Sequence, residues 1–131
     1  LLDKLGEEFS LKEIGASVLG KPIHSIQFGK GTIKILAWSQ MHGNESTTTK
    51  AVFDLLNYMN KYKESELVKS ILNNCSFCII PMLNPDGAEA YTRVNANKID
   101  LNRDAQDLSQ PESRILREQF DNFQPDFFCR S

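Results

Sequence analysis

The sequence is short of cysteine, of net charge and of long apolar runs. It has 131 residues, of which three are cysteine, and 15 basic side chains face 17 acidic ones for a net charge of -2. A chain without a positive field holds nucleic-acid phosphates poorly, and no apolar run approaches the roughly 20 residues that span a bilayer. We therefore expect neither nucleic acid nor a membrane as a partner. The chain begins without Met and shows no signal peptide, which is consistent with removal of an upstream segment and leaves the compartment open.

The cysteines do not predict a disulfide framework, because their number is odd and the chain is not rich in them. Cys75 and Cys78 form a C-x-x-C pattern, but they open the apolar run CSFCIIPM, which is typical of a buried strand. A redox pair needs a thiolate of lowered pKa, usually where a strand meets a helix. We interpret both thiols as buried structural side chains.

Strand-like and helix-like segments alternate along the chain. An Asn-Pro-Asp-Gly turn at 84–87 is expected to start a loop that runs to Asp104, and Ser109 with Glu112 forms a capping-box pattern. The helical stripe of the first long helix consists of Val52, Leu55, Leu56, Met59 and Tyr62. We expect a short helix at 1–9, a hairpin within 12–31, strands at 32–38 and 76–82, helices at 46–62 and 65–72, a helix after 109, and a last strand from 124.

This alternation predicts one domain, residues 1–131, with an α/β fold. Helices on both faces of a mixed, mainly parallel sheet would make three α/β/α layers, and neither a repeat nor a linker divides the chain. We expect the sheet to be truncated after about its fifth strand, where QPDFFCRS has just begun. Such an open edge could pair with a second copy of the chain. In sheets of this kind, chemistry gathers at the carboxyl ends of the strands.

Two loops at those ends carry the candidate functional residues. His42 and Glu45, in QMHGNEST, offer the imidazole and carboxylate that Zn²⁺ accepts, although H-x-x-E alone also fits a glutamate in the first turn of a helix. The second loop carries Arg93, Asn102 and Arg103. Guanidinium forks pair with carboxylates, and an amide adds a directed hydrogen bond. Arginines beside a pair of metal ligands would hold an anionic substrate end and stabilise an oxyanion.

Together the two loops resemble the zinc metallocarboxypeptidases of the carboxypeptidase A type. The resemblance rests on H-x-x-E after one strand, N-P-D-G after the next, and R-x-N-x-x-x-x-D-L-N-R, which lie here at 42–45, 84–87 and 93–103. It extends from about residue 20 to the end of the chain. It implies a zinc exopeptidase-like fold, of which this chain is the N-terminal portion, and hydrolysis of a C-terminal peptide bond with one Zn²⁺ in each complete site.

The resemblance also implies a role for each of the five residues. His42 and Glu45 would be two of three protein zinc ligands, and Arg93 would polarise the scissile carbonyl. Asn102 and Arg103 would bind the free C-terminal carboxylate of a peptide or amino-acid conjugate. The family's third ligand, a histidine beyond the last strand, and its general-base glutamate are absent from these 131 residues. We therefore expect this chain to be inactive alone.

Two other interpretations stay open. N-acyl-amino-acid deacylases that resemble aspartoacylase or succinylglutamate desuccinylase share the fold, the letters H-G-N-E and a D-L-N-R, whereas N-P-D-G favours a peptidase. A non-catalytic module that binds carboxylate-bearing peptides belongs to a different class, and the intact His42, Glu45, Arg93 and Arg103 disfavour it. His24 does not match the motif, and we interpret it as structural.

Overall fold

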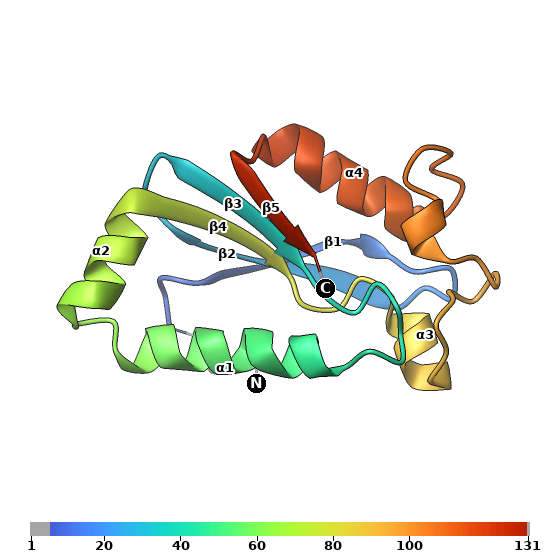
Figure 1. Cartoon of the computed structure of the whole chain (residues 1–131), viewed down its shortest axis with the longest axis horizontal. Coiled ribbons are helices and arrows are strands. Elements are labelled where there is room, and N and C mark those ends of the chain that lie inside the picture. Colours follow the sequence, from blue (N-terminus) through green and yellow to red (C-terminus); the bar gives the residue numbers. More distant parts are fainter. Residues whose placement is uncertain (1–5, 131) are drawn as a thin grey trace.

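The computed structural model describes residues 6–130, and its centre is a five-stranded sheet of order β1-β2-β4-β3-β5 (Figure 1). β1 and β2 pair antiparallel, as do β2 and β4, whereas β3 pairs parallel with both β4 and β5. β2 therefore runs against the other four strands, and the predicted mixed, mainly parallel sheet is confirmed. The strands are β1 (Ser10–Ala16), β2 (Pro22–Gly29), β3 (Ile33–Trp38), β4 (Cys75–Ile80) and β5 (Phe127–Arg130).

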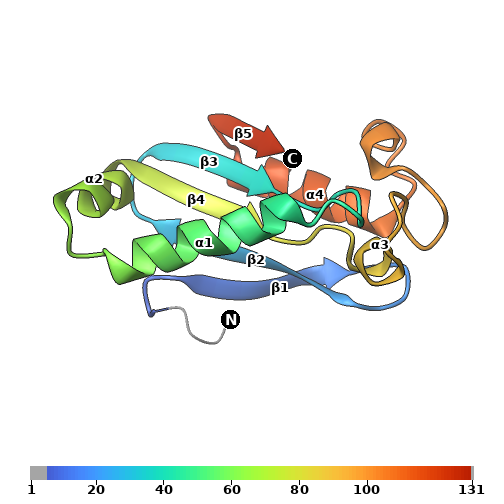
Figure 2. The same ribbon diagram turned by 60° about the horizontal axis from the view of Figure 1, so that its bottom comes forward.

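Helices cover both faces of the sheet, as the two views of the ribbon show (Figures 1 and 2). α1 (Thr47–Lys61) and α2 (Glu66–Asn74) pack on one face, and α4 (Pro111–Phe123) packs on the other. The short α3 (Pro85–Ala90) and the 3-10 turn η2 (Leu101–Arg103) follow β4. None of the helices in residues 6–130 is long and apolar enough to cross a membrane.

The core has two halves, because alternate side chains of a strand point to opposite faces of the sheet. In β4, Ile79 packs toward α1 and α2, whereas Cys78 and Ile80 pack toward α4. Burial on both sides explains why this strand reads as a continuous apolar run. Each fully buried aliphatic side chain contributes about 1.5–3 kcal/mol. The buried residues of the first half are Ile26, Phe28, Leu56, Met59, Val68 and Ile79, and those of the second are Ile23, Leu36, Trp38, Met41, Cys78, Ile80, Leu83, Leu101 and Ile115.

The thiols of β4 are free, and the prediction that both are buried holds for Cys78 and is wrong for Cys75. Cys78 is fully buried and Cys75 half-buried, and burial raises the pKa of the Cys78 thiol. A raised pKa is the opposite of what a reactive thiolate needs. Cys129, in β5, is free and exposed.

Several helix boundaries differ from the sequence prediction. The segment at 84–87 is the start of α3 and not an isolated turn, because the Asn84 side chain caps the helix by accepting a hydrogen bond from the Gly87 N–H at 2.9 Å. In α1, Leu56 and Met59 are buried as predicted, whereas Leu55 and the C-cap residue Tyr62 are exposed. Of the helix predicted at 1–9, residues 1–5 lie outside the described part, and residues 7–9 form a turn and a bend before β1.

The predicted capping box of α4 is wrong. The N-cap is Gln110, and the helix begins at Pro111, which fits the first turn because proline lacks an N–H. Ser109 instead donates its hydroxyl to Asp104. Glu112 is fully buried and accepts a hydrogen bond from Asn95 at 3.2 Å, so it holds the second loop and not the helix end.

The loop after β3 is held against α3 by very close backbone packing. A Cβ on Gly43 would lie 2.0 Å from the carbonyl carbon of Gly87 and 2.3 Å from the Ala88 nitrogen. The Asn84 side chain donates to the Met41 carbonyl at 3.1 Å, and the Asn44 N–H donates to the Thr92 carbonyl at 3.0 Å. Gly43 is therefore required for close approach.

Asp104 anchors the segment between η2 and α4. It is buried, and it accepts hydrogen bonds from the N–H groups of Ser109 at 3.0 Å and Gln110 at 2.9 Å. Burial opposes ionisation of this carboxyl, but these bonds and that from the Ser109 hydroxyl outweigh it and lower the pKa of Asp104 to about 2. The ionised carboxylate thus stabilises the folded chain.

Replacing Gly43 with alanine is expected to lower the free energy of unfolding by about 1–3 kcal/mol, because the added methyl group meets rigid backbone. Gly20→Ala is the matched control: its Cβ meets open space, and only its φ of +81° opposes the substitution, at a cost of about 1 kcal/mol. Urea unfolding of both variants measures the difference. A smaller loss for Gly43→Ala than for Gly20→Ala would contradict the close packing.

Acid unfolding should depend on Asp104. Because the folded-state pKa lies below the ordinary value of 3.8, the contribution of this carboxylate is complete above about pH 4 and is lost as the pH falls toward 2. We expect the stability of the Asp104→Asn variant to fall less steeply than that of the wild type across this window. Urea unfolding at a series of pH values tests this. The exposed Asp107→Asn is the control, and it should follow the wild type.

Candidate functional site

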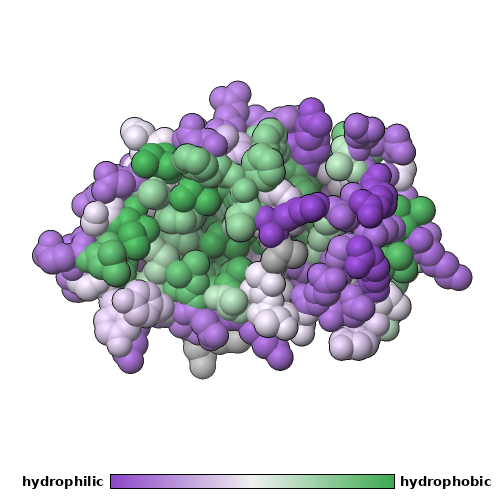
Figure 3. Space-filling view, in the orientation of Figure 1, coloured by the Kyte–Doolittle hydropathy of each residue, from purple (hydrophilic) through white to green (hydrophobic). Residues whose placement is uncertain are grey.

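Four side chains from the two predicted loops meet beyond the carboxyl ends of β3 and β4. His42 Nδ1 lies 3.2 Å from Glu45 Oε1, and His42 Nε2 lies 3.1 Å from Asp100 Oδ1. The Arg93 Nε donates to Asp100 Oδ2 at 3.1 Å, and its Nη1 lies 3.7 Å from Glu45 Oε1. The four groups form a closed ring of contacts. In the space-filling view, hydrophilic residues gather over these loops, and apolar residues gather over α2 and the strands beside it (Figure 3).

The chain turns sharply within the second loop, and this turn brings Arg93 beside Asp100. Asn95 is buried, and its side-chain oxygen accepts from the N–H groups of Asn97 at 3.1 Å and Ile99 at 3.0 Å. Its amide group donates to Gln110 at 2.8 Å. A buried asparagine with all of these partners holds the turn of the loop in place.

Asp100 sets the orientation of the His42 ring. Burial disfavours its charge, but hydrogen bonds from the Asn102 N–H, His42 and Arg93 outweigh burial and lower the pKa of Asp100. An ionised Asp100 accepts a hydrogen bond, so the proton of a neutral His42 ring resides on Nε2. The lone pair on Nδ1 then faces the Glu45 carboxylate at 3.2 Å. Two electron-rich groups that face each other in this way are suited to share a cation.

Sequence reasoning did not single out Asp100, although it lies within the motif at 93–103. A histidine that binds a metal commonly donates its other ring nitrogen to a carboxylate. The signal in the sequence that could have indicated it is the aspartate of D-L-N-R, which lies seven residues after Arg93 in the same loop. Only the folded loop shows that this carboxylate reaches His42.

Asn102 and Arg103 are placed differently. Asn102 lines a pocket of about 220 Å³ together with Met41, His42, Glu45 and Arg130, and its side-chain oxygen accepts a hydrogen bond from Arg130. Arg103 lies next to it in η2 but is exposed and does not line this pocket. Its side chain makes no hydrogen bond or ion pair with any residue in 6–130. Of the five predicted site residues, four converge and Arg103 does not.

The donor set fits a metal ion in part. Zinc in catalytic sites takes three protein ligands and keeps one position for water. The His42 ring and the Glu45 carboxylate converge and fit two of these positions. Within residues 6–130, however, no group of three or more His, Cys, Asp or Glu side chains is arranged to hold a metal.

The sequence is similar to proteins that are named as carboxypeptidases. It is 33% identical to carboxypeptidase SOL1 of Arabidopsis thaliana over 123 residues, which cover 81% of this chain and 25% of the relative. It is also 33% identical to carboxypeptidase E of Caenorhabditis elegans over 132 residues, covering 81% of this chain and 27% of the relative. The chain thus spans about a quarter of the length of these relatives.

The fold agrees with the sequence comparison. A metallo-carboxypeptidase from Burkholderia cenocepacia superposes with a TM-score of 0.89 at 24% identity, over 98% of this chain and 37% of that one. At this identity the similarity establishes the fold. The family model for zinc carboxypeptidases matches residues 2–126, which is nearly the whole chain. On these grounds the chain belongs to the zinc carboxypeptidase family.

Proposed function

We propose that His42, Glu45, Arg93 and Asn102 form part of the site of a zinc-dependent carboxypeptidase that hydrolyses the C-terminal bond of peptides. The observation that carries the proposal is the convergence of His42 Nδ1 and Glu45 Oε1 at 3.2 Å, with Asp100 on the opposite nitrogen of the ring. The family match and the geometry support the same chemistry from separate observations. Activity and substrate belong to the whole protein and are proposed here from this part of it.

In this proposal His42 and Glu45 hold the zinc ion, which would supply a Lewis acid for water and for the scissile carbonyl. Asp100 keeps the proton on His42 Nε2 and thereby leaves Nδ1 free to bind. Arg93 is half exposed and uses only some of its five N–H donors on Asp100 and Glu45. Its remaining donors are available to the carbonyl oxygen as negative charge develops there.

The carboxylate end of the substrate would be held by Asn102 and Arg103. The amide of Asn102 already lines the pocket beside His42 and Glu45. Support for Arg103 comes from the sequence motif alone, since its side chain is exposed outside the pocket. The partner is therefore a peptide or amino-acid conjugate with a free C-terminal carboxylate, and its side-chain preference is left open. Pairing of a second copy with the edge strand β5 stays a prediction.

Zinc affinity tests the metal pair directly. We expect His42→Ala and Glu45→Gln each to weaken Zn²⁺ binding strongly, and Asp100→Asn to weaken it by about 10–100-fold through loss of the hydrogen bond that orients the ring. His24→Ala is the matched control, because it removes the chain's second histidine, which lies in β2. Calorimetric titration of metal-free protein measures all four. Equal losses for His24→Ala and His42→Ala would refute the assignment.

The 131-residue chain is expected to show no hydrolysis of an N-blocked dipeptide with a free carboxylate, even with Zn²⁺ added. The physical reason is that two protein ligands hold zinc weakly and leave its position poorly fixed. Release of the C-terminal amino acid measures the reaction. Zinc-dependent release that Arg93→Ala abolishes would show that the chain is active after all, whereas release unaffected by Arg93→Ala would point to a contaminant.

A further inference from the structure

Gln40 is a buried residue in a strained backbone conformation, two positions before His42. It is 4% exposed and its φ is +52°, in the left-handed region that residues other than glycine, asparagine and aspartate rarely adopt. Such a conformation costs about 1–2 kcal/mol, and it persists only where the surroundings hold it. The Gln40 carbonyl accepts a hydrogen bond from the Asn84 N–H at 3.1 Å, which holds the strained residue against the loop after β4. Backbone strain of this kind gathers at functional sites.

The side chain of Gln40 ties the peptide between the two proposed metal ligands to α1. Its Nε2 donates to the Gly43 carbonyl at 2.8 Å, and its Oε1 accepts from the Thr49 hydroxyl at 2.7 Å. Gly43 directly follows His42 in the chain, and Thr49 is a buried residue in the first turn of α1. One amide group therefore links the loop of the metal pair to the helix that follows it.

The hydrogen bonds around Gln40 have a fixed direction. The Ser39 hydroxyl donates to the Pro81 carbonyl, and the Thr49 hydroxyl donates its single proton to Gln40 Oε1. Turning the Gln40 amide over would place its oxygen against the Gly43 carbonyl, and two acceptors would then face each other. A buried network in which these groups are all paired favours one arrangement of the loop.

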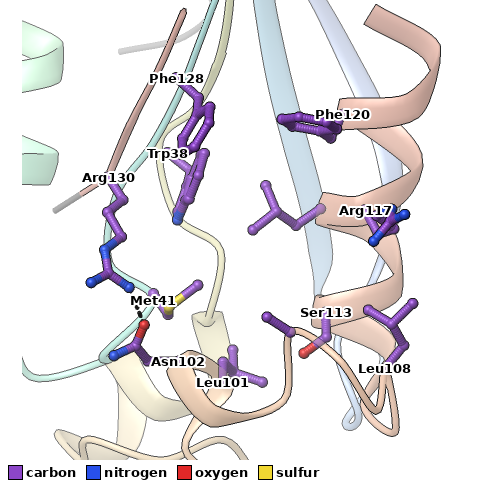
Figure 4. Close-up of a pocket in the computed structure, with 12 residues that line it drawn as sticks. Trp38, Met41, Leu101, Asn102, Leu108, Ser113, Arg117, Phe120, Phe128 and Arg130 are labelled. Atoms are coloured by element: carbon purple, nitrogen blue, oxygen red, sulfur yellow. Dashed lines mark hydrogen bonds between the residues drawn. The ribbon is translucent and has the colours of Figure 1, made fainter. Parts of the chain in front are cut away.

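The residue after Gln40 anchors the loop on the opposite face of the sheet. Met41 is 9% exposed and packs with Trp38 and Leu101 in the half of the core beneath α4. Figure 4 shows its side chain next to Trp38, in a hollow of about 350 Å³ between the sheet and α4. Gln40 bonds toward α1 and Met41 packs toward α4, so two consecutive residues hold the backbone from both layers just before His42.

We propose that Gln40 is a positioning residue for the proposed metal pair. Its amide fixes the Gly43 peptide and thereby the backbone that carries His42. From this position the His42 ring bonds to Asp100 through Nε2 and faces Glu45 through Nδ1. The inference rests on the proposed function, since the metal gives the pair its importance. The ring geometry exists without metal, however, so the two proposals can fail separately.

Two substitutions at position 40 separate positioning from stability. Gln40→Asn relieves the strain, because asparagine adopts the left-handed region more readily, but its shorter side chain cannot span from Gly43 to Thr49. Gln40→Met keeps the length and removes both hydrogen bonds. Val68→Ala is the control, because it shortens a fully buried side chain of α2, outside the network around Gln40, and destabilises the fold without changing the loop.

The tautomer of His42 is the readout, because a loss of stability alone does not change it. In the isotope-labelled full chain with EDTA, at a pH where the ring is neutral, two-bond nitrogen–proton correlations show which ring nitrogen carries the proton, and His42→Ala assigns the signals. We expect the wild type and Val68→Ala to keep the proton on Nε2, and both Gln40 variants to populate both tautomers. Gln40→Asn decides the question if the methionine variant does not fold.

Zinc affinity separates this inference from the proposed function. We expect Gln40→Asn to weaken Zn²⁺ binding by about tenfold, and Val68→Ala to change it by less than about twofold. An unchanged tautomer in Gln40→Asn, an equal change in Val68→Ala, or a zinc affinity of Gln40→Asn equal to that of the wild type would each overturn the inference. If the wild type binds no Zn²⁺ while the tautomers change as expected, the proposed function fails and the positioning of the His42 ring by Gln40 stands.

Discussion

The backbone contact between Gly43 and α3 is the constraint on which the site depends. Gly87 approaches so closely that no side chain fits at position 43, and Asn84 then bonds both to the N–H of Gly87 and to the carbonyl of Met41. One asparagine thus caps a helix and positions the neighbouring loop. Because His42 lies between Met41 and Gly43, these contacts fix the backbone that carries its ring. The backbone position of the proposed metal ligand His42 therefore depends on this packing.

Charge within the ring of four side chains has a definite sign. Glu45 and Asp100 each contribute a negative charge and Arg93 one positive charge, so the cluster carries one excess negative charge when His42 is neutral. In the proposed site, this charge would favour a cation between Glu45 and His42. Surface ion pairs alone are worth little, and Arg93 and Glu45 are each about half exposed. The ring of contacts therefore orients these four side chains and adds little to the stability of the fold.

The sequence predicted the layers and the converging loops, and it failed where tertiary contacts decide. Alternating apolar runs were sufficient for β3, β4 and α1, because burial on one or two faces leaves a clear period. Glu112 was misread as a helix cap, since nothing in its local pattern shows that Asn95, 17 residues earlier in the chain, donates to it. Arg103 matched a motif, but η2 exposes its side chain. Asp100 was overlooked because its partner His42 lies 58 residues away.

The place of Arg130 in the fold also depends on a tertiary contact that the sequence does not show. In the sequence it is one charged letter near the end of an apolar segment, and its importance depends on β5 pairing in parallel with β3, where it lies opposite Trp38. That register brings the Arg130 guanidinium beside Asn102, at the pocket that His42 and Glu45 also line. Strand pairing places it there, and nothing in the local sequence shows this.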